Sequence, residues 1–387
     1  MQRVYLDQAS TSYPKAPSVA AAVFRYLSGE AVNVGRGDYG AAHSVEERIF
    51  EAREQLCRLF QFSDPSHVIF TSGVTESLNI LLKGLLRPGD HVLVSSMEHN
   101  AVMRPLVQLA KRGVLFDRIP CRPDGSLPPE AAEALIRPST RCLVCLHASN
   151  VCGTILPAEE LGAMCRRHGI FFILDAAQTA GVLPISMEQC HVDALAFTGH
   201  KGLRGPQGTG GFLVREELAR ELEPLLSGGT GSSSHLEEMP PFLPDRFEPG
   251  TPNIPGILGL RAALEDLEQA EPGAGFRREM ALTERFLAGL RRIDGSGDLL
   301  RLAGRPDCRD RCAVVSLQAL RRDPAQAAYE LEARFGVMTR VGLHCAPSAH
   351  KTLGTFPTGT IRFSFGPENT EAEIDLALEA LEQVAKP

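Results

Sequence analysis

A lysine at the end of a predicted strand carries the most reactive side chain that the sequence places in a candidate site. Segment 194–201 reads ALAFTGHK, so that mostly apolar residues lead into a polar turn ending on Lys201, with Gly199, Gly202 and Gly205 around it. A lysine there presents its amine to a ligand at the carboxyl edge of a sheet. Such an amine can form a Schiff base with an aldehyde cofactor. Taken alone, the segment favours the alternative of a surface lysine in a glycine-rich loop.

A carboxylate upstream reverses that preference. Asp175 lies 26 positions before Lys201, at the end of the preceding predicted strand. Pyridoxal phosphate (PLP) needs such a pair: a lysine for the Schiff base, and a carboxylate that keeps the pyridine nitrogen protonated and so makes the cofactor an electron sink. Gln178 could hydrogen-bond the ring hydroxyl, and His99 could lie flat over the ring. Together these residues predict a PLP site.

A phosphate site is predicted where segment 72–77 (SGVTES) leaves one strand and opens a helix. The free N–H groups and the positive end of the helix dipole point at an anion there. Val74 and Thr75 lie in this turn, and the Thr75 hydroxyl can add a hydrogen bond. Thr198 and His200 could share the phosphate. A plain helix cap is the alternative that the local sequence leaves open.

A cysteine near the C-terminus is the candidate nucleophile. Cys345 lies in the segment RVGLHCAP, where Gly342 before it and Pro347 after it indicate a loop. An exposed loop cysteine beside His344 could be held partly as thiolate, which is the nucleophilic form. The alternative is a small apolar side chain at the base of a loop.

Four further side chains are weaker candidates. Arg362, in the strand IRFSF, could clamp a substrate carboxylate, with a structural ion pair as the alternative. Lys351 follows His350 as Lys201 follows His200, but lacks a preceding strand and aspartate, and it is the reserve Schiff-base lysine. Arg36 and His43, in a glycine-rich loop, are possible ligand contacts, although a solvated loop is favoured there.

Two other patterns carry no chemistry in this interpretation. Cys142 and Cys145 form a CxxC pair, but residues three apart in a strand face opposite sides and cannot chelate together. Segment 205–211 (GPQGTGG) precedes a strand rather than linking a strand to a helix, so it is not a dinucleotide fingerprint. We therefore expect no metal site.

The composition restricts the possible partners. The chain has 387 residues, 43% of them hydrophobic, and no run approaches the roughly 20 apolar residues that span a bilayer. The N-terminus lacks a secretory signal pattern. The formal charge of −7 is spread without a basic stripe, which argues against nucleic acid and membranes as standing partners. Ten cysteines in such a chain are expected to be reduced thiols. A cytoplasmic protein is predicted.

Strands alternate with helices from residue 67 to residue 214, which indicates an α/β domain with a mostly parallel sheet. The predicted strands cover residues 67–71, 91–95, 143–147, 171–174, 194–198 and 210–214, the last as an antiparallel or edge strand. Ligands in such folds bind at the carboxyl ends of the strands. The residues that fall there are His99, Asn150, Asp175, Gln178 and Lys201.

The alternation relaxes into an α+β pattern after about residue 250. We predict a large PLP-binding domain over residues 15–250, and a smaller domain formed by residues 1–14 and 251–387 that carries the Cys345 loop. A flexible glycine- and serine-rich stretch, residues 227–234, lies before the boundary.

Two helices are expected near the N-terminus of the large domain. One follows Pro17. The other runs to about Phe60 from an N-cap at Ser44, with Glu47 three residues later as in a capping box.

These residues resemble those of the class V aminotransferase family, in its cysteine desulfurase and selenocysteine lyase branch. The resemblance extends from LDQAST near the start to IRFSF near the end, through SGVTESLN, MEHN, HASNVCG, DAAQ, TGHKG, FEPGTPN and RVGLHCA. It implies the type I fold of PLP-dependent transferases and a homodimer.

The resemblance also implies roles for individual residues. Lys201 would carry PLP, Asp175 would pair with the pyridine nitrogen and Gln178 with the ring oxygen. His99 would stack on the ring and handle protons. The remaining implied roles are phosphate binding by Thr75, Thr198 and His200, with Thr251 from the other subunit; substrate carboxylate binding by Asn150 and Arg362; and capture of the sulfur as a persulfide by Cys345.

The implied reaction is conversion of L-cysteine to L-alanine. The short HCAP context resembles the branch members with a compact catalytic loop, which hand the persulfide to a dedicated acceptor protein or to small thiols. L-Selenocysteine remains open as the substrate, as does another class V reaction such as transamination or β-elimination. A non-catalytic protein on a decayed fold is a further alternative, but Lys201 and Asp175 are intact. The 227–234 stretch and the PPFLP segment depart from the expected pattern and leave the sulfur acceptor open.

Overall fold

A seven-stranded sheet forms the centre of the structure, a computed structural model that describes residues 3–35 and 39–386. Its strands run in the order β2-β8-β7-β6-β5-β3-β4. Only β8 runs against its neighbours in the described sheet, which confirms the predicted α/β class with a mostly parallel sheet. The bounds are β2 (Val68–Thr71), β3 (His91–Ser95), β4 (Leu115–Ile119), β5 (Thr140–Leu146), β6 (Phe171–Asp175), β7 (Ala194–Thr198) and β8 (Gly210–Val214).

Strand β8 is antiparallel, as one of the two predicted options had it, but it is not an edge strand. It lies between β2 and β7, and the edges of the sheet are β2 and β4. The edge strand β4 has an exposed and polar pattern, LFDRI, which explains why its sequence gave no strand signal.

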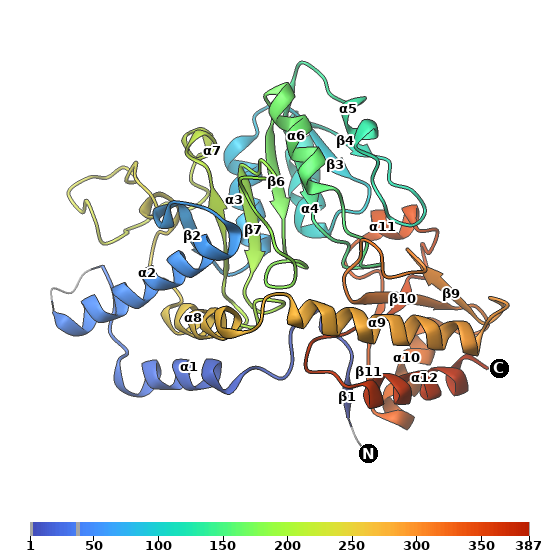
Figure 1. Cartoon of the computed structure of the whole chain (residues 1–387). Helices are drawn as coiled ribbons and strands as arrows, with labels where there is room; N and C mark the ends of the chain where they lie inside the picture. The colour runs from blue at the N-terminus through green and yellow to red at the C-terminus, as the bar shows by residue number, and fades with distance from the viewer. Residues whose placement is uncertain (1–2, 36–38, 387) are drawn as a thin grey trace.

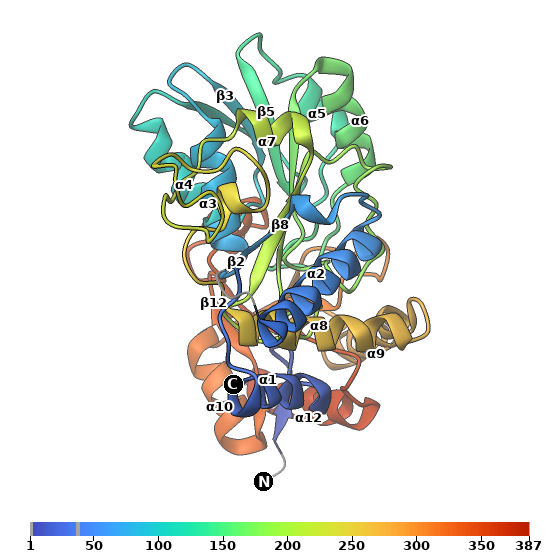
Figure 2. The same cartoon turned by 90° about the vertical axis from the view of Figure 1, so that its left-hand side faces the viewer.

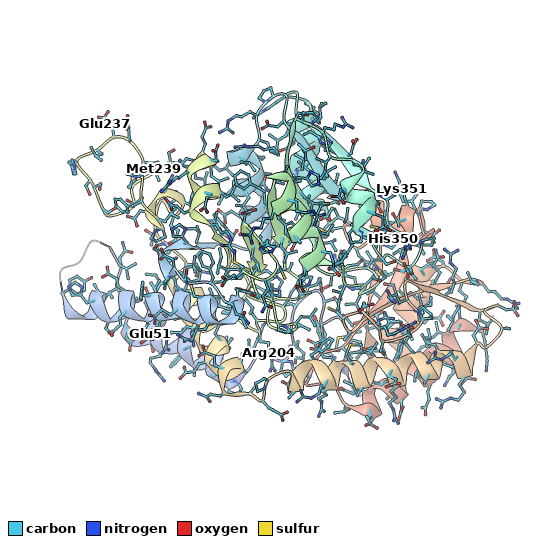
Figure 3. The ribbon with its side chains drawn as sticks, turned by 45° about the horizontal axis from the view of Figure 1, so that its top comes forward. Glu51, Arg204, Glu237, Met239, His350 and Lys351 are labelled. Carbon is cyan, nitrogen blue, oxygen red and sulfur yellow. The ribbon has the colours of Figure 1, made fainter. Side chains whose placement is uncertain are left out.

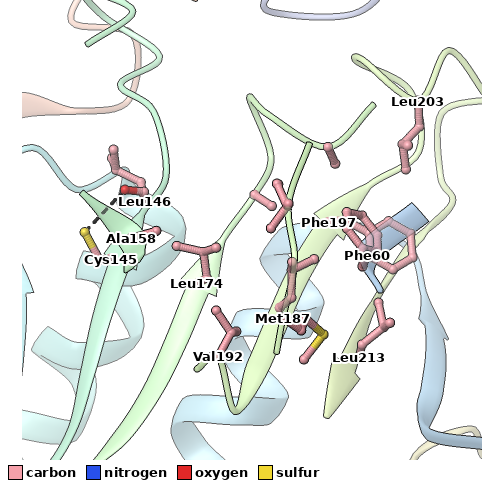
Figure 4. Packing of buried hydrophobic residues seen from close by; sticks show 14 of the residues in the cluster. Phe60, Cys145, Leu146, Ala158, Leu174, Met187, Val192, Phe197, Leu203 and Leu213 are labelled. Atoms are coloured by element: carbon pink, nitrogen blue, oxygen red, sulfur yellow. Dashed lines mark hydrogen bonds between the residues drawn. The ribbon is translucent and has the colours of Figure 1, made fainter. Parts of the chain in front are cut away.

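The two faces of the sheet are covered by separate hydrophobic clusters. Helices α2 (Gly40–Phe60) and α6 (Ala158–His168) contribute to the first cluster, and α3 (Val74–Leu85) and α4 (Asn100–Ala110) to the second. Along β5, Cys145 belongs to one cluster and Cys142 to the other. The CxxC pair therefore faces opposite sides, as predicted. Figure 4 shows part of the first cluster, where Phe60 packs against Phe197 with ring centroids 6.0 Å apart.

Helix α2 begins one turn earlier than predicted. Its N-cap is Tyr39, and Ser44 lies inside the helix, where its carbonyl accepts a hydrogen bond from Arg48 Nε. The predicted capping box at Ser44 is therefore wrong, because Ala41 and Ala42 favour helix and extend it upstream. His43 likewise lies in the first turn of α2, 3.5 Å from Glu46, rather than in a loop.

Helices α1 (Pro17–Gly29) and α8 (Ile254–Gln269) pack together below the large sheet, where α2 crosses α8 (Figure 2). Pro17 opens α1, as predicted. Helix α8 supplies Ile257, Leu258 and Leu260 to the same core cluster as the sheet. Since α8 packs with the large sheet, we propose that the boundary between the domains lies after α8 rather than at residue 250.

A second, four-stranded sheet lies beside the first part in Figure 1, with the order β12-β13-β10-β9. The residues around this sheet form a third hydrophobic cluster of the molecule. It includes Val4 and Leu6 from the N-terminus, because β1 pairs in parallel with β11. The bounds are β1 (Val4–Tyr5), β9 (Leu300–Ala303), β10 (Val314–Ala319), β11 (Val337–Met338), β12 (Arg340–Gly342), β13 (Thr360–Ser364), α9 (Ala274–Ile293), α10 (Pro324–Phe335), α11 (Pro347–Thr352) and α12 (Glu371–Ala385). Short helices α5 (Pro129–Glu133), α7 (Glu216–Glu221), η1 (Pro65–His67) and η2 (Asp245–Phe247) complete the described elements.

Helix α6 depends on a glycine to approach the segment that connects β6 to β7. A Cβ atom at Gly162 would lie 1.8 Å from the carbonyl oxygen of Cys190, so Gly162→Ala must displace backbone. We expect this variant to lose about 1–3 kcal/mol of stability, by overpacking. Gly29→Ala is the control, because a Cβ there meets no atom within 4 Å. Thermal unfolding should show a Tm several degrees lower for Gly162→Ala only, and equal melting of the two variants would contradict the packing.

Candidate active site

Four neighbouring strands bring the predicted residues to one edge of the sheet. Strands β3, β5, β6 and β7 are successive neighbours and parallel, so their carboxyl ends meet. Five predicted residues lie at or just after these ends: His99, Asn150, Asp175, Gln178 and Lys201. The reserve lysine is elsewhere. Lys351 is exposed on α11 with its amine 5.2 Å above the Phe356 ring, and Figure 3 places it far from Arg204, which follows Lys201 in the same loop.

The amine of Lys201 is set up as a nucleophile. Lys201 lies in the turn after β7, on the wall of a cavity that Gln178 also lines. Burial lowers the pKa of the Lys201 amine to about 8, against the opposing effect of the Asp175 carboxylate and with a further lowering by Arg362 and Arg340. A fraction of the amine is therefore unprotonated at neutral pH, which is the form that attacks a carbonyl carbon.

Asp175 ends β6 as a buried carboxylate with spare acceptor capacity. Its Oδ1 accepts a hydrogen bond from Ala177 N at 2.9 Å. Burial raises the pKa of Asp175, while the Ala177 N–H and the Lys201 charge lower it. A carboxylate in this position gains from a protonated ring nitrogen beside it. Gln178, one turn later, donates from Nε2 to Ala9 O at 3.2 Å.

His99 caps α4 and is neutral. Its Nδ1 accepts a hydrogen bond from Ala101 N at 3.0 Å, so the neutral ring carries its proton on Nε2. Burial and the nearby Lys201 and Arg340 lower the pKa of His99 to about 4. At neutral pH the ring is therefore uncharged and presents an N–H donor at Nε2.

An acidic neighbour of His99 escaped the sequence reasoning. Glu98 is fully buried, and its Oε1 pairs with Ser95 Oγ and accepts from Leu146 N at 3.1 Å. Burial raises the pKa of Glu98 to about 8, so the carboxyl is mostly protonated at neutral pH. A neutral Glu98 avoids repelling Asp175. The only signal in the sequence was an acidic residue three positions after a buried strand.

The predicted phosphate site has the geometry of an anion cradle. Gly73 is the N-cap of α3 with φ 150° and ψ 177°, a conformation that favours glycine, and no side chain caps the helix there. The free first-turn N–H groups, with exposed Thr75 and half-buried Val74, are thus open to an anion. Thr198 Oγ1 lies 3.5 Å from where a Cβ on Gly73 would stand.

His200, which was predicted to share the phosphate, has an unused ring nitrogen. Its Nδ1 is buried and has no hydrogen-bond partner among the described residues. Its carbonyl is held by Ser12 N at 2.9 Å and by Lys15 Nζ at 2.9 Å, so the N-terminal segment fixes the turn that leads to Lys201. An unpaired buried ring nitrogen is the feature expected of a group that waits for a ligand.

Arg362 lies in a network that includes residues missed by the sequence reasoning. It is 2% exposed, and its Nη2 donates to Asp7 Oδ1 and to Ser10 Oγ at 2.7 Å each. Its Nη1 donates to Asn150 O at 3.0 Å, and Arg340 reaches the same Ser10. The ion-pair alternative for Arg362 is thus present, while its Nε is unpaired among the described residues. No local signal links positions 355 residues apart.

The loop of Cys345 lies against the N-terminus of α4. Cys345 is exposed, and its carbonyl accepts from Asn100 N at 2.8 Å. His344 and Cys345 both have positive φ, 46° and 57°, which is uncommon for residues with a side chain. Asn150 Nδ2 donates to His344 O at 2.8 Å, which ties this loop to the loop after β5.

The role predicted for His344 beside Cys345 is wrong. The His344 ring is buried, its Nε2 pairs with Thr360 Oγ1 at 3.0 Å, and burial lowers its pKa to about 2. It is neutral at physiological pH and cannot supply the positive charge that would hold a thiolate.

Thr251 is not among the predicted residues that these strand ends bring together. Thr251 is exposed, just before α8, where Asn253 Nδ2 donates to Gly208 O at 2.9 Å. Arg36 lies outside the described residues.

Comparison with known protein families shows the family to which this chain belongs. The model of the aminotransferase class-V family matches residues 4–377. The chain belongs to this family. Members of the family depend on PLP, and the fold is that of the type I PLP enzymes.

Several similar proteins match this chain over almost their whole length, and their names contain the term cysteine desulfurase. A probable cysteine desulfurase of Methanothermobacter thermautotrophicus is 33% identical over 99% of this chain and 94% of its own. Cysteine desulfurase CsdA of Escherichia coli is 33% identical over 98% of this chain and 93% of its own. The apo structure of cysteine desulfurase from Thermococcus onnurineus NA1 matches with a TM-score of 0.91 at 31% identity, over 99% of this chain and 94% of that one.

The residues present in this class V chain fit PLP. The Lys201 amine suits the aldehyde, and the Asp175 carboxylate has spare acceptor capacity for the ring nitrogen. The uncapped α3 N-terminus and the unpaired His200 Nδ1 suit the phosphate.

A search of the described helices found none with the length and apolar character that a membrane span requires.

Gly73→Ala tests the phosphate cradle. A side chain disfavours the φ of 150° at Gly73, and relaxation would turn the first N–H groups of α3 away from the anion. We expect about tenfold weaker PLP binding, the value of one lost charge-assisted hydrogen bond. Gly89→Ala is the matched control, with φ 97° in a turn away from the site and no atom within 4 Å of a Cβ. Equilibrium dialysis measures both affinities, and equal affinities would exclude the cradle.

The rate of PLP uptake by apoprotein should rise with pH, with a midpoint near the Lys201 pKa of about 8, because only the neutral amine reacts. Arg340 lowers that pKa, so Arg340→Gln should move the midpoint upward and Arg340→Lys should leave it nearly unchanged. Stopped-flow absorbance follows the uptake. A midpoint that stays in place in Arg340→Gln would show that the amine does not sense this charge.

Proposed function

We propose that this chain is a PLP-dependent L-cysteine desulfurase, which releases L-alanine and retains the sulfur on Cys345 as a persulfide. The observation that carries the proposal is the hydrogen bond from Asn100 N to Cys345 O, 2.8 Å long, which holds the backbone of the exposed Cys345 against the residue that follows His99. A transaminase would need no thiol there. The names of the similar proteins support the same activity.

The substrate carboxylate is proposed to bind at Arg362. The guanidinium is buried, and its unpaired Nε leaves one donor for a ligand. Asn150 is proposed to share this role. One N–H of its Nδ2 is donated to His344 O, and the second N–H is left as a donor for a carboxylate. We propose that Asn150 also holds Arg362 through its backbone carbonyl and the Cys345 loop through its side-chain amide.

Proton movement is assigned to Lys201 and His99. Bound PLP supplies an electron sink that stabilises negative charge at the substrate Cα. The Lys201 amine, with a pKa of about 8, takes the Cα proton. His99 Nε2–H donates to the substrate side, since its Nδ1 is occupied by Ala101 N.

Cys345 then receives the sulfur. Its thiolate attacks the substrate sulfur, a new S–S bond forms, and the Cβ–S bond breaks with its electron pair staying on the carbon skeleton. Protonation of that carbon, and return of a proton from Lys201 to Cα, give L-alanine. Because Cys345 is exposed, its persulfide is accessible to a sulfur-acceptor protein or a small thiol.

A homodimer and a cytoplasmic location belong to the same proposal. Thr251 is exposed at the start of α8, so it is free to reach the phosphate region of a second subunit. Val74, Thr75, Thr198 and His200 would complete that region within one chain.

Cys345→Ala tests the proposal. With L-cysteine and a reductant, the wild-type holoenzyme should release alanine and sulfide in equal amounts, and the variant should lose at least about 100-fold of this activity, as for removal of an essential nucleophile. Cys308→Ala, at another partly exposed cysteine, is the control and should stay active.

Other outcomes redirect the assignment. An unchanged rate of alanine release by Cys345→Ala would contradict the formation of a persulfide on Cys345. Alanine from L-selenocysteine but not L-cysteine would indicate a selenocysteine lyase, and no alanine from either would indicate another class V reaction.

A further inference from the structure

A cavity of about 750 Å³ lies next to the candidate active site, between the start of α9, the loop after β7 and the segment after β13. It shares Lys201 and Gln178 with that site, but not His99, Asn150, Asp175, Cys345 or Arg362. Its volume is in the range of small-molecule sites, roughly 300–1,000 Å³. Figure 3 shows Arg204, one of its lining residues, beside the start of α9.

The walls of the cavity are mostly apolar and come from distant parts of the chain. Leu59 from the end of α2, Val182 and Leu183 from the loop after β6, Phe276 from α9 and Phe365 from the end of β13 line it. Such walls favour a ligand with an apolar body.

One carboxyl group inside the cavity has no partner. Glu279, on α9, is 8% exposed and lines the cavity, and no hydrogen bond or ion pair to its carboxyl is present among the described residues. Burial raises the pKa of Glu279 to about 8, with Arg204 opposing this shift. A buried polar group without a partner costs free energy, so it marks a place where a ligand can supply the missing bond.

The other three carboxylates that line the cavity are already paired. Glu268 binds Arg58 at 2.9 Å, and the remaining ion pairs are Arg277–Glu271 and Arg204–Glu368. Among the described residues, Glu279 is therefore the lining carboxyl group without an ion pair, and a cationic ligand would supply one.

We propose that this cavity binds a small organic cation, whose apolar body contacts Val182, Leu183 and Phe276 and whose protonated amine donates a hydrogen bond to the Glu279 carboxylate. The site shares Lys201 and Gln178 with the candidate active site, but binding at Glu279 does not depend on the proposed desulfurase activity. Because α9 and the loops that follow β6 and β7 all line the cavity, a bound molecule would contact these elements together.

The probe for this site is N,N-dimethylhexylamine, a tertiary amine that cannot condense with the PLP aldehyde. Isothermal titration of the holoenzyme at pH 8 should show one bound molecule per chain. Glu279→Gln keeps the shape of the side chain but removes the charge, and it should bind the probe about tenfold more weakly or worse. Glu284→Gln, an exposed position on the same helix, should bind as the wild type does.

Two further measurements separate the elements of the proposal. Leu183→Trp should fill the cavity and abolish binding, while thermal unfolding of each variant confirms that it is folded. Hexan-1-ol, a neutral probe, should distinguish the wild type from Glu279→Gln by less than the amine does. Absence of binding to the wild type, or equal affinity of Glu279→Gln, would overturn the proposal whether or not the protein releases alanine.

Discussion

The buried Arg362–Asp7 ion pair is the interaction on which the candidate site depends. It joins the N-terminal segment to β13 and, through Asn150 O, to the loop after β5. A guanidinium with 2% exposure needs such a partner, because a buried charge left alone costs several kcal/mol. The same guanidinium keeps Nε unpaired. One side chain thus holds three segments together and retains an unpaired donor, which the proposed substrate carboxylate would use.

Burial, more than any single charge, sets the protonation states around this network. It is the largest influence on the pKa of Lys201, His99 and Glu98. Each shift favours the uncharged form of the group, as a low-dielectric site requires. The result is a nearly neutral environment in which the Asp175 carboxylate and the arginines are the main charges. A cofactor phosphate would add its charge at the α3 N-terminus, on the side of the helix dipole that stabilises it.

The loop of Cys345 shows how backbone strain and exposure are combined. Two successive residues with positive φ turn the chain sharply, and hydrogen bonds from Asn100 and Asn150 hold that turn. Strained backbone persists only where the surroundings enforce it. Here they leave Cys345 exposed while the neighbouring His344 is buried, which fits the proposed role of Cys345 in receiving sulfur and passing it on.

The sequence by itself determined the strand ends and therefore the main chemical groups. Alternating strands and helices place Asp175, Gln178 and Lys201 at one edge of a parallel sheet, because that edge follows from strand direction alone. Tertiary structure decided what no local pattern contains. It paired Asp7 with Arg362 across 355 positions, neutralised His344 by burial, and left Glu279 unpartnered in a cavity. Pairing, burial and solvation depend on residues distant in sequence, so only the folded chain could settle them.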